Sequence, residues 1–203
     1  MIGKIRKGRS FGGCIRYVTQ KDDAEIIASE GVLLGTAEET ARSFRWQCLL
    51  SPDVAKPVGH IALSFKPEDA PRLTDAFMAR LAEEYLELMG IRNTQFIVVR
   101  HHGTDNPHCH IVFNRVDFDG KVISDSNDFR RNERVTKMLK KKYSLTYSEG
   151  KQSVKTEKLH ASERVKYEIY RAVKEALRSA DTWKEFQNRL LKMGVEMEFK
   201  YKG

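Results

Sequence analysis

The stretch "RHHGTDNPHCHIVFNRV", residues 100–116, contains four of the 6 histidines in the chain. Its second half alternates in the manner of a β-strand, so that His108 and His110 share one face while Ile111 and Phe113 share the other. Apolar residues on one face indicate a buried core. We therefore expect a strand over 108–118 whose histidines point to the open side of a sheet.

Other strands can be placed around this one. The segments 2–8, 58–65 and 94–101 each have strand-like patterns, and 195–202 alternates strictly. The pair Asp119-Gly120 between "RVDF" and "KVIS" is typical of a hairpin, which would turn the strand over 108–118 back on itself. A hairpin at this central position favours antiparallel pairing over a doubly wound parallel sheet.

Helices are expected between the strands. Thr36 and Glu39 have the spacing of a capping box at the start of a helix over 37–50. Asp69 and Gly90 would cap and end a helix over 70–89. Further helices are expected over 127–142, from Ser162 onward and over 182–194, with one or two turns near Cys14. The predicted buried stripes include Leu73, Phe77, Leu81, Tyr85 and Leu88 in the 70–89 helix, and Val165, Ile169, Val173, Ala176 and Leu177 in the helix after Ser162.

These elements predict an α+β fold, with a mainly antiparallel central sheet and helices packed on one face. Residues 1–150 would form a catalytic core and residues 151–203 a C-terminal helical extension. The last predicted strand has no partner after it, so we expect the chain to be the N-terminal part of a longer protein.

Composition limits the classes of function. The chain has 203 residues, a net charge of +8 and a pI of about 9.4, and a basic chain of this kind commonly binds a polyanion such as nucleic acid. Three irregularly spaced cysteines suit a reducing cytoplasm better than a disulfide framework. No apolar run approaches the ~20 residues of a membrane span, and the N-terminal segment lacks the apolar core of a signal peptide.

The histidines predict a metal site. His108 and His110 lie two residues apart on one strand face, and a third ligand from the neighbouring strand would complete a set that holds one divalent ion. Because adjacent residues alternate, only one of His101 and His102 can point inward. Asn114 shares the face of His108 and could orient a ligand or a phosphate. The alternative is a group of polar surface histidines at a strand end, which their density disfavours.

The pattern "H-x-x-T-D-N-P-H-x-H-I-V-x-N-R-V", together with an earlier "R-Y-V-T" and an intervening "S-F", resembles the conjugative relaxase or mobilisation nuclease family. These proteins are HUH endonucleases, named for histidine–hydrophobic–histidine, and the resemblance is to the MobP-like relaxase domain. It covers roughly residues 1–145. The histidine motif is specific, whereas the tyrosine motif is short and gains weight from its order and distance.

The resemblance implies a mechanism. Tyr17 would attack a phosphodiester of single-stranded DNA at the nick site of a transfer origin, forming a 5′-phosphotyrosyl bond and releasing a 3′-OH. His108, His110 and His101, with His102 as the alternative, would hold Mg²⁺ or Mn²⁺ against the phosphate.

The chain departs from the family at one position. Family members commonly have Asp two residues after the first histidine, where this chain has Gly103. Asp105 could supply the missing carboxylate.

Basic residues are the expected DNA contacts. The segment 127–142 is strongly basic and follows the histidine motif, which favours a surface that tracks phosphates. Such contacts position DNA without reading its sequence. The expected contacts are Lys4, Arg6, Arg9, Arg16, Arg115, Arg130, Arg131, Arg134, Lys137, Lys140 and Lys141. The resemblance also implies a hairpin beside the nick site, and accessory mobilisation and coupling proteins as partners.

Three other interpretations stay open at this point. A rolling-circle replication initiator would use similar chemistry with a tyrosine after the histidine motif, such as Tyr143 or Tyr147. A basic nucleic-acid-binding module would bind without metal and form no covalent product. A metallohydrolase using activated water would form no protein–DNA adduct.

Overall fold

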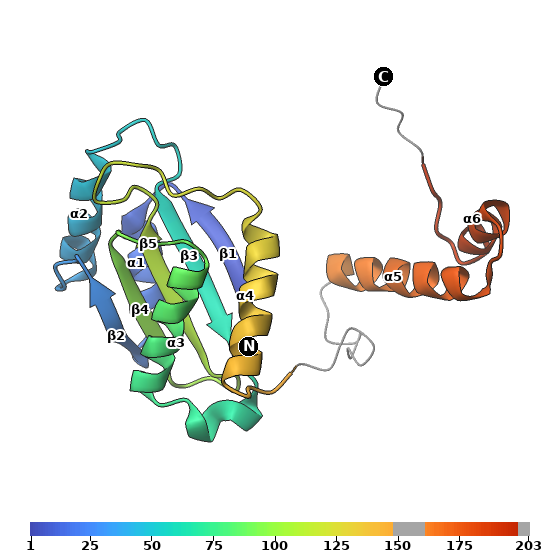
Figure 1. The fold of residues 1–203 in the computed structure, drawn as a ribbon, viewed down its shortest axis with the longest axis horizontal. Helices are drawn as coiled ribbons and strands as arrows, with labels where there is room; N and C mark the ends of the chain where they lie inside the picture. The colour runs from blue at the N-terminus through green and yellow to red at the C-terminus, as the bar shows by residue number, and fades with distance from the viewer. Residues whose placement is uncertain (148–160, 199–203) are drawn as a thin grey trace. The chain divides into compact units, whose positions relative to one another are not determined.

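The computed structural model describes residues 1–147 and 161–198. The chain divides into two compact units, Met1–Ser148 and Glu149–Gly203, and each is described by itself (Figure 1).

The first unit contains a five-stranded sheet with strand order β1-β3-β5-β4-β2. All four neighbouring pairs are antiparallel. The strands are β1 (Ile2–Gly8), β2 (Ala24–Glu30), β3 (Val58–Ser64), β4 (Phe96–His101) and β5 (His108–Asn114). The prediction of an α+β fold with an antiparallel sheet is confirmed, and the histidine strand β5 lies at its centre. The edge strand β2 was not predicted, and an irregularity between Ile26 and Ala28 interrupts its alternation.

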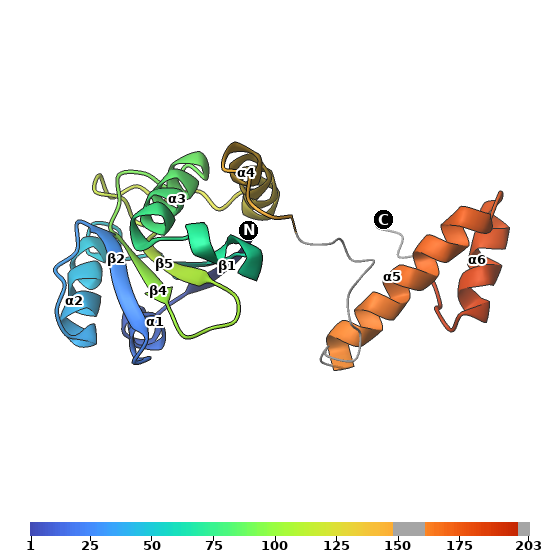
Figure 2. The same cartoon turned by 90° about the horizontal axis from the view of Figure 1, so that it is seen from below.

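Helices cover both faces of the sheet, whereas the sequence led us to expect one. On one face lie α1 (Phe11–Thr19) and α2 (Ala37–Cys48), and on the other α3 (Asp75–Leu88) and α4 (Asp128–Lys142), as Figure 2 shows. Two separate apolar clusters fill the two interfaces. In β4, Val98 packs toward α3 and α4 while Val99 packs toward α1 and α2. The strand β4 is apolar on both sides over Phe96–Val99, and the histidine face of the sheet, which we expected to be open, is covered in part by α1 and α2.

The helix α1 begins earlier and runs longer than the one or two turns expected. Ser10 accepts a hydrogen bond from the backbone N–H of Gly13 at 3.2 Å and so caps its start. The α2 helix starts as predicted, with Thr36 and Glu39 forming the capping box.

The predicted helix over 70–89 is shorter in the structure. A 3₁₀ helix, η1 (Pro67–Arg72), precedes it, and Thr74 caps α3. The Thr74 hydroxyl accepts a hydrogen bond from the backbone N–H of Phe77 at 3.2 Å, so the α-helix starts at Asp75 and not at 70. Asp69 is not a cap, and its carboxylate accepts hydrogen bonds from Thr146 instead. Gly90, with a φ of +72°, follows the end of α3. The predicted end of this helix at Gly90 is confirmed.

Two other details of the first unit differ from the prediction. Leu88, expected in the buried stripe of α3, is 38% exposed. The turn at Asp119-Gly120 forms, with Gly120 at φ +76°, but only a single bridge between Val116 and Val122 flanks it, so β5 does not continue into a hairpin.

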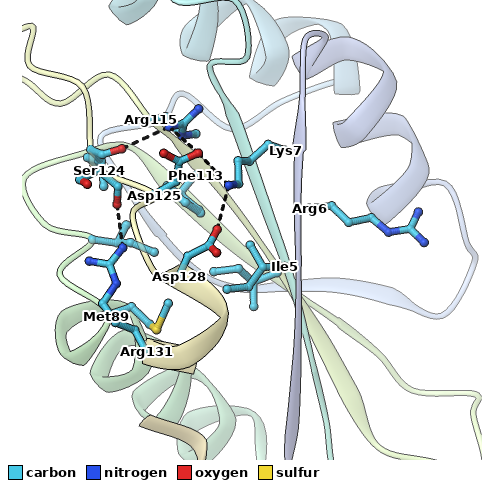
Figure 3. Close-up of a pocket in the computed structure, with 13 residues that line it drawn as sticks. Ile5, Arg6, Lys7, Met89, Phe113, Arg115, Ser124, Asp125, Asp128 and Arg131 are labelled. Atoms are coloured by element: carbon cyan, nitrogen blue, oxygen red, sulfur yellow. Dashed lines mark hydrogen bonds and ion pairs between the residues drawn. The ribbon is translucent and has the colours of Figure 1, made fainter. Parts of the chain in front are cut away.

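Charged side chains tie β1 to the loop that precedes α4 (Figure 3). Lys7 pairs with Asp125 at 2.7 Å and with Asp128 at 2.8 Å, and Arg115 lies 3.3 Å from Asp125. Arg131 donates to a carbonyl of the same loop at 2.7 Å. The cavity between them has a volume of about 30 Å³, which is room for about one water molecule. This network fixes the position of α4 on the sheet.

The second unit contains α5 (Ala161–Ser179) and α6 (Trp183–Lys192). Ala172, Ala176, Phe186 and Leu190 form its small core. Three residues predicted to point inward are exposed: Val165 by 52%, Ile169 by 42% and Leu177 by 62%. The short α6 covers only part of α5, which explains the difference.

The strand expected over 195–202 is wrong for residues 195–198, which are not in a strand, and its remainder lies outside the described residues. Among the described residues, no helix is long and apolar enough to cross a bilayer.

The close packing of Gly59 gives a first prediction. Gly59 on β3 is opposite Phe113 on β5, and a Cβ at position 59 would overlap the Phe113 ring. We expect Gly59→Ala to lower the free energy of unfolding by about 1–3 kcal/mol in urea titrations, as overpacking does. Gly13→Ala is the control, because a Cβ there meets only ordinary contacts at 3.7 Å and α1 gains a better helix former. Equal stability of both variants would contradict this interpretation.

Candidate active site

A cavity of about 420 Å³ opens at one end of the first unit's sheet. Tyr17, His101, His108 and His110 line it, together with Asp105. The cavity therefore brings together a tyrosine from α1, a histidine from β4, two histidines from β5 and the loop between these strands.

Strand register places the three histidines. His101 on β4 is directly opposite His108 on β5, and His110 lies two residues further along the same face. Their ligand nitrogens all lie within 4.8 Å of one another. His102 points elsewhere, with its Nε2 3.0 Å from a carboxylate oxygen of Glu25. Of the two alternatives at this position, the structure brings His101 to the cluster.

The hydrogen bonds of His101 and His108 define their protonated nitrogens. His101 Nε2 lies 2.8 Å from the carbonyl of Val18, and His108 Nδ1 lies 3.1 Å from the carbonyl of Asn106. Since a carbonyl only accepts, both of these nitrogens carry the proton. The remaining nitrogens, His101 Nδ1 and His108 Nε2, then face each other as lone pairs only 3.2 Å apart. Two facing lone pairs favour a cation, so the donor set fits a metal ion.

Burial favours the neutral form of two histidines in the cluster, His108 and His110. Burial lowers the pKa of His108 below its ordinary value. Burial, with the neighbouring histidines adding to it, lowers the pKa of His110 to about 3. A neutral imidazole is the form that binds metal.

Tyr17 lies beside the histidines. Its ring is 5.8 Å from the ring of His110 in an edge-on arrangement, and its side chain is 62% exposed toward solvent. The next residue, Val18, supplies the carbonyl that orients His101. The end of α1 is therefore hydrogen-bonded to the metal-ligand candidate, and Tyr17 lies beside the cluster.

Asp23 occupies the space that a side chain at Gly103 would take. Its carboxylate accepts from the backbone N–H of Gly103 at 2.6 Å, and a Cβ on Gly103 would lie 2.7 Å from the same oxygen. The Gly103 N–H lowers the pKa of Asp23. The chain thus holds a carboxylate beside the end of β4, supplied by the loop after α1. Sequence reasoning missed this, because the two residues are 80 positions apart.

His60 was also missed as a site residue. Its Nε2 lies 3.0 Å from Nδ1 of His110, and its ring is 5.9 Å from that of Tyr17. Burial, together with the charge of Arg6, lowers the pKa of His60. The alternation of 58–65 gave its face correctly, but only the pairing of β3 with β5 reveals its neighbour.

Asn114 does not join the site. It is fully buried, and its amide nitrogen donates to the carbonyl of Phe44 at 3.0 Å. Four residues along a strand separate it from His110, which is roughly 13 Å. Its amide attaches α2 to the sheet, and its expected role in orienting a ligand or phosphate stays a prediction.

The alternative tyrosines lie away from the histidines. Tyr143 donates a hydrogen bond to Glu84 at 2.5 Å and packs on Phe77 of α3. Tyr147 contacts Lys140 of α4. Both contact helices on the face of the sheet opposite the histidines, whereas Tyr17 is on the same face.

The comparisons with known proteins agree with this geometry. Residues 17–145, more than half of the chain, match the family described as "Relaxase: MobA/VirD2-like, nuclease domain". This chain belongs to the relaxase family. No curated protein matches it. A relaxase nuclease domain nicks DNA, and in this relaxase the histidines and Tyr17 lie within the matched segment.

The basic residues of the relaxase fall into separate groups. Lys4 and Arg6 are exposed and pair across the sheet with Ala62 and His60, so they share the histidine face. Arg9 is exposed where β1 ends, and Arg16 on α1 is 3.9 Å from Glu38. The α4 residues Arg130, Arg134, Lys137, Lys140 and Lys141 belong to a helix on the opposite face.

Two predicted DNA contacts of the relaxase are engaged in structural interactions. Arg115 has a side chain only 11% exposed and pairs with Asp125, and Arg131 donates to the Ser124 carbonyl. Both line the small cavity of Figure 3. Their positions are explained by the attachment of α4.

The lowered pKa of His110 makes stability depend on pH. The unfolded chain binds a proton near pH 6.5, which the folded chain resists until about pH 3. The contribution of His110 is therefore fully present above about pH 6.5 and is lost as pH falls. In EDTA, we expect the free energy of unfolding to fall between about pH 7.5 and about pH 5.5, and to fall less in His110→Gln. Identical pH dependence in the two proteins, measured by urea titration, would count against a buried neutral His110.

Proposed function

We propose that this relaxase is a site- and strand-specific single-stranded DNA endonuclease and transesterase, which nicks a transfer origin through Tyr17 for conjugative mobilisation. The observation that carries the proposal is the position of the Tyr17 ring, 5.8 Å from His110 and beside three histidines with converging nitrogens. The origin DNA would be found in the cytoplasm of the donor cell, and accessory mobilisation and coupling proteins are further proposed partners.

His101, His108 and His110 would hold the divalent ion. When bound, the ion supplies Lewis acidity that polarises the scissile phosphate and stabilises its developing charge. Among the predicted ions, Mn²⁺ suits three imidazole donors better than Mg²⁺, which prefers oxygen. The Val18 and Asn106 carbonyls support this assignment, because they leave one nitrogen of His101 and one of His108 free for the ion.

Tyr17 would be the nucleophile. Its phenolic oxygen attacks phosphorus, the bond from phosphorus to the 3′ oxygen breaks, and the 3′ oxygen gains a proton to become a 3′-OH. The 5′-phosphate stays on Tyr17 as an ester of similar energy, so the reverse attack by a 3′-OH rejoins a strand without ATP. The exposure of Tyr17 supports this role, because a DNA phosphate can reach its hydroxyl.

Single-stranded DNA would approach along the β1 side of the cavity. Lys4 and Arg6 lie on the histidine face, Arg9 lies between the end of β1 and the start of α1, and Arg16 lies in the last turn of α1. Ser64 pairs with His108 across the sheet and also lines the cavity. Cations along this edge would bind successive phosphates. The exposed α4 cations remain candidates for the proposed origin hairpin.

Tyr17→Phe tests the nucleophile. Labelled single-stranded oligonucleotides covering the DNA beside the gene would be incubated with Mn²⁺ and analysed on a denaturing gel. We expect the wild-type protein to form a covalent adduct that survives SDS and requires metal, and Tyr17→Phe to form none, because the attacking oxygen is lost. Tyr143→Phe is the matched control and should keep the adduct.

The other outcomes separate the alternatives. An adduct that persists in Tyr17→Phe and disappears in Tyr143→Phe or Tyr147→Phe would overturn the assignment of the nucleophile in favour of an initiator-like enzyme. Metal-dependent cleavage without an adduct would indicate a hydrolase that uses activated water. Salt-sensitive binding with no cleavage of any oligonucleotide would favour a binding module.

The DNA path has its own test. We expect Lys4→Ala and Arg6→Ala each to weaken binding of a single-stranded oligonucleotide and to reduce the slope of log K against log salt by about 0.7 per lost phosphate contact. Arg130→Ala and Arg134→Ala, on the opposite face, should change single-strand binding less. Fluorescence anisotropy at several salt concentrations measures both effects. A larger loss in the α4 variants would place the single strand on the other face.

A further inference from the structure

His60 makes a contact that the proposed chemistry leaves unexplained. It is half-buried on β3, and its Nε2 lies 3.0 Å from Nδ1 of His110. The two rings are 5.1 Å apart, and the ring of Tyr17 is edge-on to both, at 5.9 Å from His60 and 5.8 Å from His110. His60 therefore contacts both a candidate ligand, His110, and the candidate nucleophile, Tyr17.

The bond to His60 determines which nitrogen of His110 is free for an ion. Nδ1 of His110 is engaged with His60, so Nε2 is the nitrogen available to bind metal. An imidazole that binds metal through Nε2 carries its proton on Nδ1 and donates it to an acceptor. The acceptor here is Nε2 of His60, which requires His60 to carry its own proton on Nδ1.

Each of the three ligand candidates has such an acceptor. For His101 it is the carbonyl of Val18, and for His108 it is the carbonyl of Asn106. Both of these carbonyls belong to the backbone, and the hydroxyl of Thr104 also lies 3.1 Å from Nδ1 of His108. His110 differs because the acceptor for its Nδ1 is the imidazole of His60 and no backbone carbonyl serves it among the described residues.

We propose that His60 is a positioning residue of this site: it holds His110 in the Nδ1-protonated tautomer and at the ring angle required for metal binding. The inference rests on the proposed assignment of His101, His108 and His110 as ligands. His60 acts through His110 and through its ring contact with Tyr17. It does not itself bind the ion.

Mn²⁺ affinity of the full chain tests the proposal without DNA or catalysis. The metal-free protein is titrated with Mn²⁺ by calorimetry, with His60→Phe and His60→Gln in parallel. We expect His60→Phe to weaken Mn²⁺ binding by about 10- to 100-fold, as the loss of a ligand's hydrogen-bond acceptor does. His60→Gln retains an acceptor oxygen and should recover part of the affinity. His102→Gln is the control, because His102 lies next to a ligand candidate but bonds to Glu25.

A second measurement reads the tautomer directly. In ¹⁵N-labelled wild-type protein we expect His110 to show the Nδ1-protonated signature, and in His60→Phe a mixture of tautomers. Thermal unfolding of each metal-free variant checks the fold. If His60→Phe does not fold, the comparison of His60→Gln with the wild-type protein carries the test, with a smaller expected loss.

Two results would overturn the inference. One is unchanged Mn²⁺ affinity in folded His60→Phe while His108→Ala loses binding. The other is a wild-type protein that binds no Mn²⁺, which would remove the ligand assignment as well. A protein that binds Mn²⁺ with the expected His60 dependence but forms no DNA adduct would instead contradict the proposed nicking and leave the role of His60 intact.

Discussion

The pairing of β5 with β3 and β4 positions the whole candidate site. His108 is opposite both His101 and Ser64, and His110 is opposite Ala62 and diagonal to His60. Side chains alternate along a strand with a period of two, so a slip of one residue would turn every one of these groups to the other face. Such a slip would also bury the polar histidines of β5 in the apolar cluster on the other face, which disfavours it. Ile111 faces one core and Val112 the other, and both are fully buried.

Helices on both faces of the sheet explain why the histidines of the site are buried. A sheet with one open face would leave its histidines solvated, with ordinary pKa values. Here α1 covers part of the histidine face, and burial lowers the pKa of His108 and His110. The same covering helix supplies Tyr17 and the carbonyl of Val18. One short helix therefore excludes water from the ligands, orients one of them and carries the candidate nucleophile.

The sequence predicted the parts of this arrangement that depend on local pattern. Alternation gave the faces of His108 and His110, and the capping box of Thr36 and Glu39 gave the start of α2. The sequence did not predict positions that depend on contacts between residues far apart in the chain. Asn114 has the correct alternation for the site but is buried beneath α2. Arg115 has the charge of a DNA contact but pairs with Asp125. Neither partner is visible without the fold.

His60 and Asp23 lie near the site although the sequence did not single them out. Each looked ordinary in sequence, because nothing near it in the chain suggests a role. His60 reaches His110 only because β3 pairs with β5, and Asp23 reaches Gly103 only because β2 lies beside β4. A Cβ on Gly103 would lie 2.7 Å from a carboxylate oxygen of Asp23, so a side chain at this position would require the Asp23 side chain to shift. Contacts of this kind depend on strand pairing, so the residues that adjoin either partner in the chain do not reveal them.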